Sequence, residues 1–174
     1  MVLTEAFFLL PEKGRLRRPF SLVLTLLLSI AACQTGPEPG ATADGLVTRV
    51  DHVVDGDTVW VDDLGESVRL IGIDTPEIDP EQECFGEEAR DRLNDLIPGG
   101  TRVVIRFDIE EFDRFGRYLG YVYRQTDGLF VNQVMVEEGL AKTLRIEPNI
   151  RFADELREAE EEAVGRGLGL WSTC

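Results

Sequence analysis

Histidine and lysine are almost absent from this sequence of 174 residues, with His52 the single histidine and Lys13 and Lys142 the lysines. The three cysteines stand far apart, at positions 33, 84 and 174. Zinc sites are usually built from closely spaced cysteines and histidines, so this composition argues against zinc. His52 falls in the first predicted strand, and we interpret it as an ordinary strand residue.

The apolar run at 20–30 is shorter than the ~20 residues that a transmembrane helix needs. It follows a basic cluster at 15–18 and precedes Ala31, Ala32 and Cys33, the order found in secretion signals. The stretch IAAC at 30–33 resembles the bacterial lipobox, which predicts a signal peptide at 1–32 and lipidation of Cys33. A buried structural cysteine at the end of an apolar helix is the alternative.

Residues 33–45 are rich in Gly, Pro, Thr and Ala, and this composition is typical of a flexible tether. We therefore expect an exported protein, anchored by lipid to the cell envelope. The anchor would lie either on the outer face of the cytoplasmic membrane or in an outer membrane. The export route stays open, because Arg17 and Arg18 faintly resemble a twin-arginine signal.

Positive charge is scarce. The formal net charge is −15, and beyond residue 32 there are 14 basic residues against 31 acidic ones. Such a surface repels polyanions, so the overall charge argues against a nucleic-acid partner. Only a local arrangement of the basic side chains could reverse that conclusion.

Alternating apolar and polar residues predict three strands at 46–54, 58–61 and 67–73, and two further strands at 101–107 and 117–123. Helical spacing predicts helices at 86–96, 130–141 and 152–164, with the glutamates at 160–162 on a solvated face. This order of elements is typical of an α+β fold. We expect a five-stranded OB-type β-barrel with three packed helices over residues 46–174.

Two segments concentrate polar residues at strand ends. DGDTV at 55–59 puts Asp57 just after a tight turn, and taken alone it is explained by the turn. RLIGIDTPE at 69–77 begins with Arg69 and ends in Asp74, Thr75 and Glu77. Carboxylates so close together are costly without a cation, although a turn at 75–77 and a surface ion pair of Arg69 are simpler readings.

A third segment, DRFGR at 113–117, ends in Arg117 at the start of a strand. The planar fork of arginine matches two phosphate oxygens. DGDTV, RLIGIDTPE, FGEEA, DRFGR, VNQVMVEEGLAK and GLW occur in this order between residues 55 and 171. Together they resemble the staphylococcal nuclease, or thermonuclease, family over about residues 46–173.

The resemblance implies an OB-barrel nuclease that uses no histidine. Asp57 and Asp74 would bind Ca²⁺ through their carboxylates, and Thr75 through its main-chain carbonyl. Glu77 would activate or orient the attacking water. Arg69 and Arg117 would hold the phosphate and offset its growing charge. The substrate would be DNA and/or RNA, and the products would carry 3′-phosphate and 5′-hydroxyl ends.

The sequence departs from the family in its loops. Acidic residues follow Glu77, where the best-known members are rich in lysine, and Arg145 and Glu147 stand where the family has tyrosines that flank the nucleotide. Arg145 could bind a phosphate instead. Arg114 and Lys142 are further candidates for contacts with the nucleic-acid backbone.

If Cys33 carries lipid, Cys84 and Cys174 are left in a compartment that permits disulfides, and we expect a bridge between them. Two free thiols are the alternative. Two other functions remain: a non-catalytic OB-type module that binds nucleic acid or an envelope partner, and a structural lipoprotein with an acidic surface. A monomer is the default expectation.

Overall fold

The computed structural model describes residues 45–174. The predicted signal peptide at 1–32, the lipidation site Cys33 and nearly all of the tether at 33–45 lie outside the described residues.

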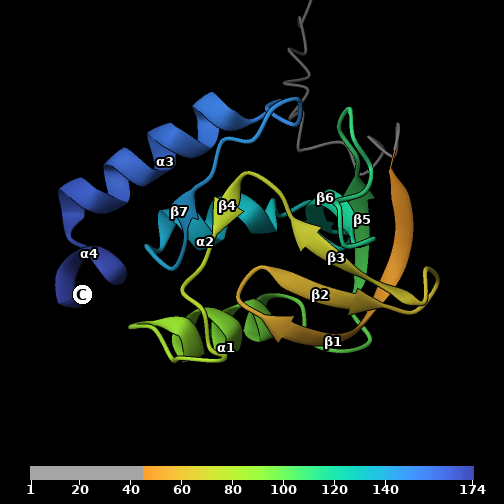
Figure 1. Ribbon diagram of the computed structural model, residues 1–174, viewed down its shortest axis with the longest axis horizontal. Coiled ribbons are helices and arrows are strands. Elements are labelled where there is room, and N and C mark those ends of the chain that lie inside the picture. Colours follow the sequence, from red (N-terminus) through yellow and green to blue (C-terminus); the bar gives the residue numbers. More distant parts are fainter. Residues whose placement is uncertain (1–44) are drawn as a thin grey trace, which may run out of the picture. The chain divides into compact units, whose positions relative to one another are not determined.

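Five strands close into a barrel in the order β1 (Leu46–Asp55), β2 (Thr58–Val61), β3 (Glu66–Leu70), β6 (Tyr118–Arg124) and β5 (Arg102–Arg106). Neighbouring strands are antiparallel except β3 and β6, which run parallel (Figure 1). The barrel interior is filled by fully buried branched side chains, among them Val59, Val68 and Ile105. Alternation along the strands therefore placed one face of each strand in the core, and the predicted five-stranded barrel is confirmed.

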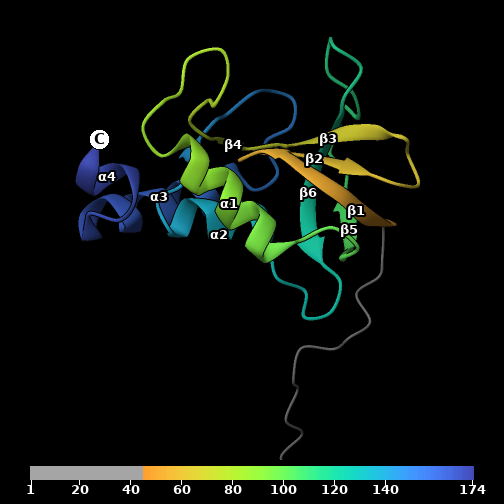
Figure 2. The same ribbon diagram turned by 90° about the horizontal axis from the view of Figure 1, so that it is seen from below.

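The three predicted helices are α1 (Gly86–Leu96), α2 (Val131–Glu137) and α3 (Ala153–Arg166), followed by a single extra turn, α4 (Leu170–Thr173). They lie beside the barrel: α1 packs against β1 and α2, and α2 packs against β6 and α3 (Figure 2). The apolar faces of the three helices contribute to the common core, with one fully buried residue from each as an example: Leu93, Met135 and Leu156. No helix within residues 45–174 is both long and apolar enough to cross a membrane.

The prediction of one continuous strand at 67–73 was wrong. Gly72 adopts a positive φ of 83°, so the chain leaves the barrel after Leu70. A short strand β4 (Ile73–Asp74) then pairs with β7 (Lys142–Thr143) in a second, two-stranded sheet. This departure from the barrel places Asp74 outside it, at the edge where the candidate site lies.

The helix predicted at 130–141 was too long. Gly139 adopts a φ of 71°, and the N–H groups of Leu140 and Ala141 both turn back to the carbonyl of Met135. These contacts end the helix and let the chain enter β7.

The glutamates at 160–162 are only partly a solvated face. Glu161 and Glu162 are exposed, but the carboxylate of Glu160 accepts the N–H of Thr143 at 3.0 Å and its hydroxyl at 2.6 Å. Helix α3 is thereby tied to β7.

A buried asparagine and a disulfide join the elements around the site. Asn132 is fully buried; its side chain accepts the N–H of Val122 at 2.9 Å and donates to the carbonyl of Ile71 at 2.8 Å. A disulfide links Cys84, just before α1, to Cys174 at the end of the chain. The hydrogen bonds of Asn132 fix the turn after β3 to β6 and α2, and the disulfide fixes the loop before α1 to the C-terminal residue.

Candidate active site

Asp57 is held by the turn between β1 and β2. Its N–H donates to the carboxylate of Asp55 at 3.0 Å. Gly56 packs so tightly that a Cβ there would lie 2.6 Å from Oγ1 of Thr75 and 2.8 Å from Cβ of Ala89. The N–H of Thr75 in turn donates to Oδ2 of Asp57 at 3.1 Å. The turn and the segment after β4 are thus fitted against each other, which fixes where the Asp57 carboxylate lies.

Arg69, on β3, joins the two carboxylates expected to bind metal. Its Nη2 atom lies 2.8 Å from Oδ2 of Asp57 and 3.0 Å from Oδ1 of Asp74. Its Nη1 atom donates to the carbonyls of Leu70 at 2.6 Å and Ile73 at 3.0 Å. The side chains of Arg69 and Asp57 are only 14% and 9% exposed, so their ion pair is largely buried, whereas the Asp74 side chain is half-exposed.

The pKa of Asp57 is raised from 3.8 to about 7. Burial is the largest cause and the charge of Asp55 adds to it, while Arg69, the N–H of Thr75 and the hydroxyl of Thr58 act in the opposite direction. A cation beside this carboxylate would favour the ionised form and lower that pKa. Positive charge placed next to Asp57 would therefore stabilise its ionised carboxylate.

The donor set fits calcium. Two carboxylate oxygens, from Asp57 and Asp74, converge on one positively charged nitrogen atom, and hard oxygen donors are the ligands that Ca²⁺ prefers. Within residues 45–174 no group of three or more His, Cys, Asp or Glu residues is arranged to hold a metal. The expected set has two carboxylates and the main-chain carbonyl of Thr75, so water and substrate would complete the coordination.

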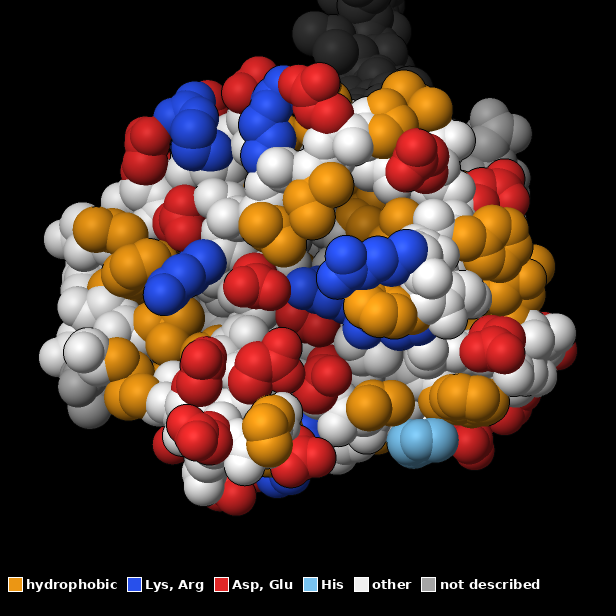
Figure 3. Space-filling view, in the orientation of Figure 1, with side chains coloured by type: hydrophobic (Ala, Val, Ile, Leu, Met, Phe, Trp, Pro, Cys, Tyr) orange, Lys and Arg blue, Asp and Glu red, His pale blue; other side chains and the backbone are white. Residues whose placement is uncertain are grey.

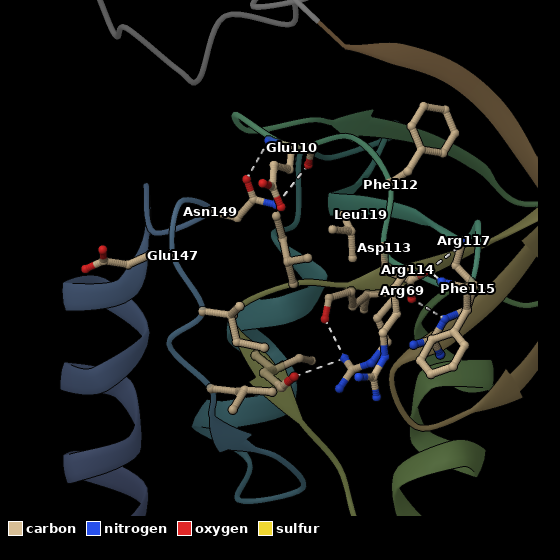
Figure 4. Close-up of a pocket in the computed structure, with 16 residues that line it drawn as sticks. Arg69, Glu110, Phe112, Asp113, Arg114, Phe115, Arg117, Leu119, Glu147 and Asn149 are labelled. Carbon is tan, nitrogen blue, oxygen red and sulfur yellow. Dashed lines mark hydrogen bonds and ion pairs between the residues drawn. The ribbon is translucent and has the colours of Figure 1, made fainter.

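Beside Arg69 lies a cavity of about 480 Å³, walled by the end of β3, the loop between β5 and β6, and the loop after β7. Arg69, Arg114 and Arg117 gather around Phe115 at one end, and Asn149 and Glu147 lie at the other (Figure 4). The guanidinium carbons of Arg114 and Arg117 lie 4.7 Å and 5.7 Å from the centre of the Phe115 ring. Three arginines therefore face one cavity.

Asp113 orients Arg117. Its Oδ2 accepts from Nε of Arg117 at 2.7 Å, and its Oδ1 accepts the N–H groups of Phe115 at 2.8 Å and Arg117 at 3.0 Å. Burial alone would raise the pKa of Asp113, but these hydrogen bonds together outweigh it and leave the pKa below its ordinary value. Asp113 stays ionised near neutral pH and keeps the arginine in place.

Basic side chains lie side by side on the face drawn in Figure 3. Lys and Arg side chains lie across the middle of that face, and Asp and Glu side chains lie directly below them. In a chain of net charge −15, this local gathering is what a phosphate-containing partner requires.

The remaining expected site residues lie apart from the cavity. Glu77 is exposed in the loop after β4, and its carboxylate has no hydrogen bond or ion pair with other residues of the described domain. Lys142 pairs in register with Asp74 across β4 and β7. Arg145 forms an ion pair with Glu147 at 3.3 Å and lines a separate cavity of about 100 Å³.

Two supporting residues, Asp113 and Asn149, were not predicted from the sequence. The buried Asn149 side chain accepts the N–H groups of Ile109 and Glu110 at 3.0 and 2.9 Å and donates to the carbonyl of Glu110 at 2.9 Å, which fixes the far wall of the cavity. An aspartate that opens a turn before Gly116 was a usable signal for Asp113. Nothing local marked Asn149, because its partners lie about 40 positions earlier in the chain.

Comparison with known proteins identifies the family of this chain and agrees with the fold. The family described as staphylococcal nuclease homologue matches residues 67–173, and the chain belongs to that family. It is 37% identical over 130 residues to the SPbeta prophage-derived endonuclease YokF of Bacillus subtilis (strain 168), an alignment that covers 71% of this chain and 43% of YokF. Endonuclease YncB of the same organism is 36% identical over 130 residues, covering 71% of this chain and 60% of YncB.

The thermonuclease of Staphylococcus hyicus is 31% identical over 147 residues, with 80% of this chain and 85% of the relative covered. The chain thus spans about half the length of the two Bacillus relatives and most of the thermonuclease.

Proposed function

We propose that this domain hydrolyses phosphodiester bonds in DNA and/or RNA in a calcium-dependent reaction that leaves 3′-phosphate and 5′-hydroxyl ends. The observation that carries the proposal is the convergence of Arg69, Arg114 and Arg117 on one cavity, beside the carboxylates of Asp57 and Asp74. Family membership and relatives named endonuclease and thermonuclease support it.

The arginines would bind the scissile phosphate. Asp113 occupies Nε of Arg117, so the two terminal nitrogens of that guanidinium are left as donors to phosphate oxygens. Donors held in place in this way stabilise charge that develops in the transition state without reorganising. Arg69 would contribute from the opposite strand of the parallel pair β3–β6.

Glu77 would orient or deprotonate the attacking water, for which an exposed carboxylate free of intramolecular partners within the described domain is suited. Asp57, Asp74 and the carbonyl of Thr75 would hold Ca²⁺. Calcium bound there would supply positive charge that offsets the charge of the phosphate.

More remote contacts with the substrate backbone would come from Arg114 at the cavity, and from Lys142 and Arg145 along the strand and loop beside it. The exposed acidic residues Asp79, Glu81 and Glu83 follow Glu77 and would oppose the approach of a polyanion. We therefore expect binding to depend on divalent cations as well as on the arginines.

The decisive experiment incubates the purified chain with single- and double-stranded DNA and with RNA, in Ca²⁺ or in chelator, beside Glu77→Gln and Arg117→Ala. We expect cleavage that needs Ca²⁺, and an activity about 10²- to 10³-fold lower in Arg117→Ala, as for other fixed transition-state donors. End-labelling of the products reads the 3′-phosphate. Folded protein that binds nucleic acid but never cuts it would instead identify a non-catalytic OB-type binding module.

We also propose that the protein is exported and held at the cell envelope as a monomer by a lipid on Cys33. The support is the order of basic, apolar and small residues before that cysteine. Mass spectrometry of the N-terminal peptide from membranes tests it. Cys33→Ala should leave the protein out of the lipid-modified fraction, and an unmodified, membrane-free Cys33 in the wild type would refute the anchor.

A further inference from the structure

The N–H and the carbonyl of Glu77 both form hydrogen bonds with Glu83, six positions later in the chain. The N–H of Glu77 donates to Oε2 of Glu83 at 3.2 Å, and the carbonyl of Glu77 accepts the N–H of Glu83 at 2.8 Å. Both residues are exposed, and no helix or strand imposes this pairing. The two contacts close residues 77–83 into a ring that begins and ends at Glu77.

The base of that ring is pressed against the start of α1. A Cβ on Gly86 would lie 2.7 Å from the carbonyl oxygen of Glu77, so only glycine allows this approach. Phe85 adopts a φ of 73°, rare for a residue with a side chain, while its ring packs against the core. An unfavourable backbone conformation at Phe85 therefore lies directly beside the contact between Gly86 and Glu77.

The disulfide attaches this segment to a second fixed point. Cys84 is adjacent to Glu83, and its partner Cys174 ends the turn α4. That turn is docked firmly: the N–H of Leu170 donates to the carbonyl of Gly139 at 2.8 Å, and a Cβ on Gly169 would lie 2.2 Å from the same oxygen. The C-terminus thus serves as an anchor for the loop that carries Glu77.

We propose that Glu83 is a positioning residue that fixes the backbone of Glu77, and that the Cys84–Cys174 disulfide holds Glu83 in place for this task. This inference rests on the proposed role of Glu77 in the nuclease reaction. Glu83 acts through a hydrogen bond acceptor and not through its charge, because its partner is a main-chain N–H. The neighbouring Glu81 is also exposed, and its side chain forms no hydrogen bond or ion pair within the described domain, so it provides a matched control.

The test compares Glu83→Ala, Glu83→Gln and Glu81→Ala in the full chain, by steady-state kinetics with Ca²⁺ and by amide hydrogen exchange at Glu77 followed by NMR. In Glu83→Ala we expect kcat to fall about tenfold to a hundredfold with KM within about twofold, because small misplacements of a reacting group have effects of this size. The Glu77 amide should exchange about tenfold faster. Glu83→Gln keeps an acceptor and should restore both values to within about twofold. Glu81→Ala removes an acidic side chain from the same loop and should keep the wild-type kcat and the wild-type exchange rate at Glu77, whatever its effect on KM.

The disulfide is tested by the double variant Cys84→Ser, Cys174→Ser, in which exchange at Glu77 should also rise. Unchanged exchange there would remove the disulfide from the proposal. Normal kcat and normal exchange in Glu83→Ala, or a Glu83→Gln variant as impaired as Glu83→Ala, would overturn the role of Glu83. A wild type that never cleaves nucleic acid would refute the proposed function, while the exchange measurements would still decide whether Glu83 fixes the Glu77 backbone.

Discussion

Loss of the disulfide between Cys84 and Cys174 should lower the free energy of unfolding substantially. The two cysteines are 90 residues apart, so the bridge closes a loop that includes most of the domain. A loop of this length restricts the unfolded chain by about 5 kcal/mol in the chain-entropy treatment, and measured losses commonly reach about 2–4 kcal/mol. Both cysteines are exposed, so replacing them with serine leaves no buried cavity. We therefore expect a loss of about 2–4 kcal/mol.

Urea unfolding of the double variant Cys84→Ser, Cys174→Ser, followed by tryptophan fluorescence, measures this loss. The midpoint should fall and the m value should rise, because an unfolded chain without the bridge exposes more surface. Wild type unfolded in a dithiol reductant should behave like the double variant. A double variant within about 0.5 kcal/mol of oxidised wild type would refute the reasoning, since that difference is no larger than that of an ordinary surface substitution.

Three further outcomes are expected. The pKa of Asp57 is 3.8 in the unfolded chain and about 7 in the folded one, so the folded state binds the proton more tightly. In chelator, the wild type should therefore lose stability relative to Asp57→Asn as the pH rises from 3.8 to about 7, measured by urea unfolding at several pH values. A stability difference between the two proteins that does not change with pH would contradict the raised pKa. Gly56→Ala should lower the free energy of unfolding by about 1–3 kcal/mol, because its Cβ would clash with Thr75 and Ala89. Gly165→Ala, on open helix surface, should raise it by about 0.5–1 kcal/mol. Thermal melts in which both variants behave alike would contradict the packing argument. Asn132→Ala should cost about 1–3 kcal/mol in urea, because two buried main-chain groups lose their partner, and a cost near zero would show that those groups find other partners.

The barrel was predictable because its strands carry their own signal. Residues 46–50 alternate between core and surface, residues 58–61 are a short β-branched and aromatic run that is mostly buried, and the glycine turn between the two strands is local. The parallel contact of β3 with β6 and the pairing of β4 with β7 were not predictable in this way. They join segments about 50 and 70 positions apart, and two-residue strands have no period to detect.

The candidate site was predictable as a set of residue types, and less so as a geometry. Asp57, Arg69 and Asp74 could be picked out from short motifs, yet their direct contact depends on the turn at Gly72 and on the fit of Gly56 against Thr75. No sequence pattern predicted the hydrogen bonds between Glu83 and the main chain of Glu77. A glutamate that accepts a main-chain N–H is indistinguishable in sequence from one that faces water.

The parallel register of β3 and β6 has a consequence for how such a domain can change over time. Arg69 lies opposite Leu119, two residues beyond Arg117, so the spacing of the two arginines is set by adjoining backbones inside the barrel wall. The loop from Phe107 to Phe112 lies outside the β3–β6 pairing and meets it through its backbone, where the N–H of Leu119 donates to the carbonyl of Glu111 at 2.8 Å. The side chains of Glu110 and Phe112 line the same cavity as Arg69 and Arg117. Under the proposed function, substitutions of these two side chains would change which polymers the cavity admits while the two arginines keep their spacing, so recognition and chemistry could diverge independently on one scaffold.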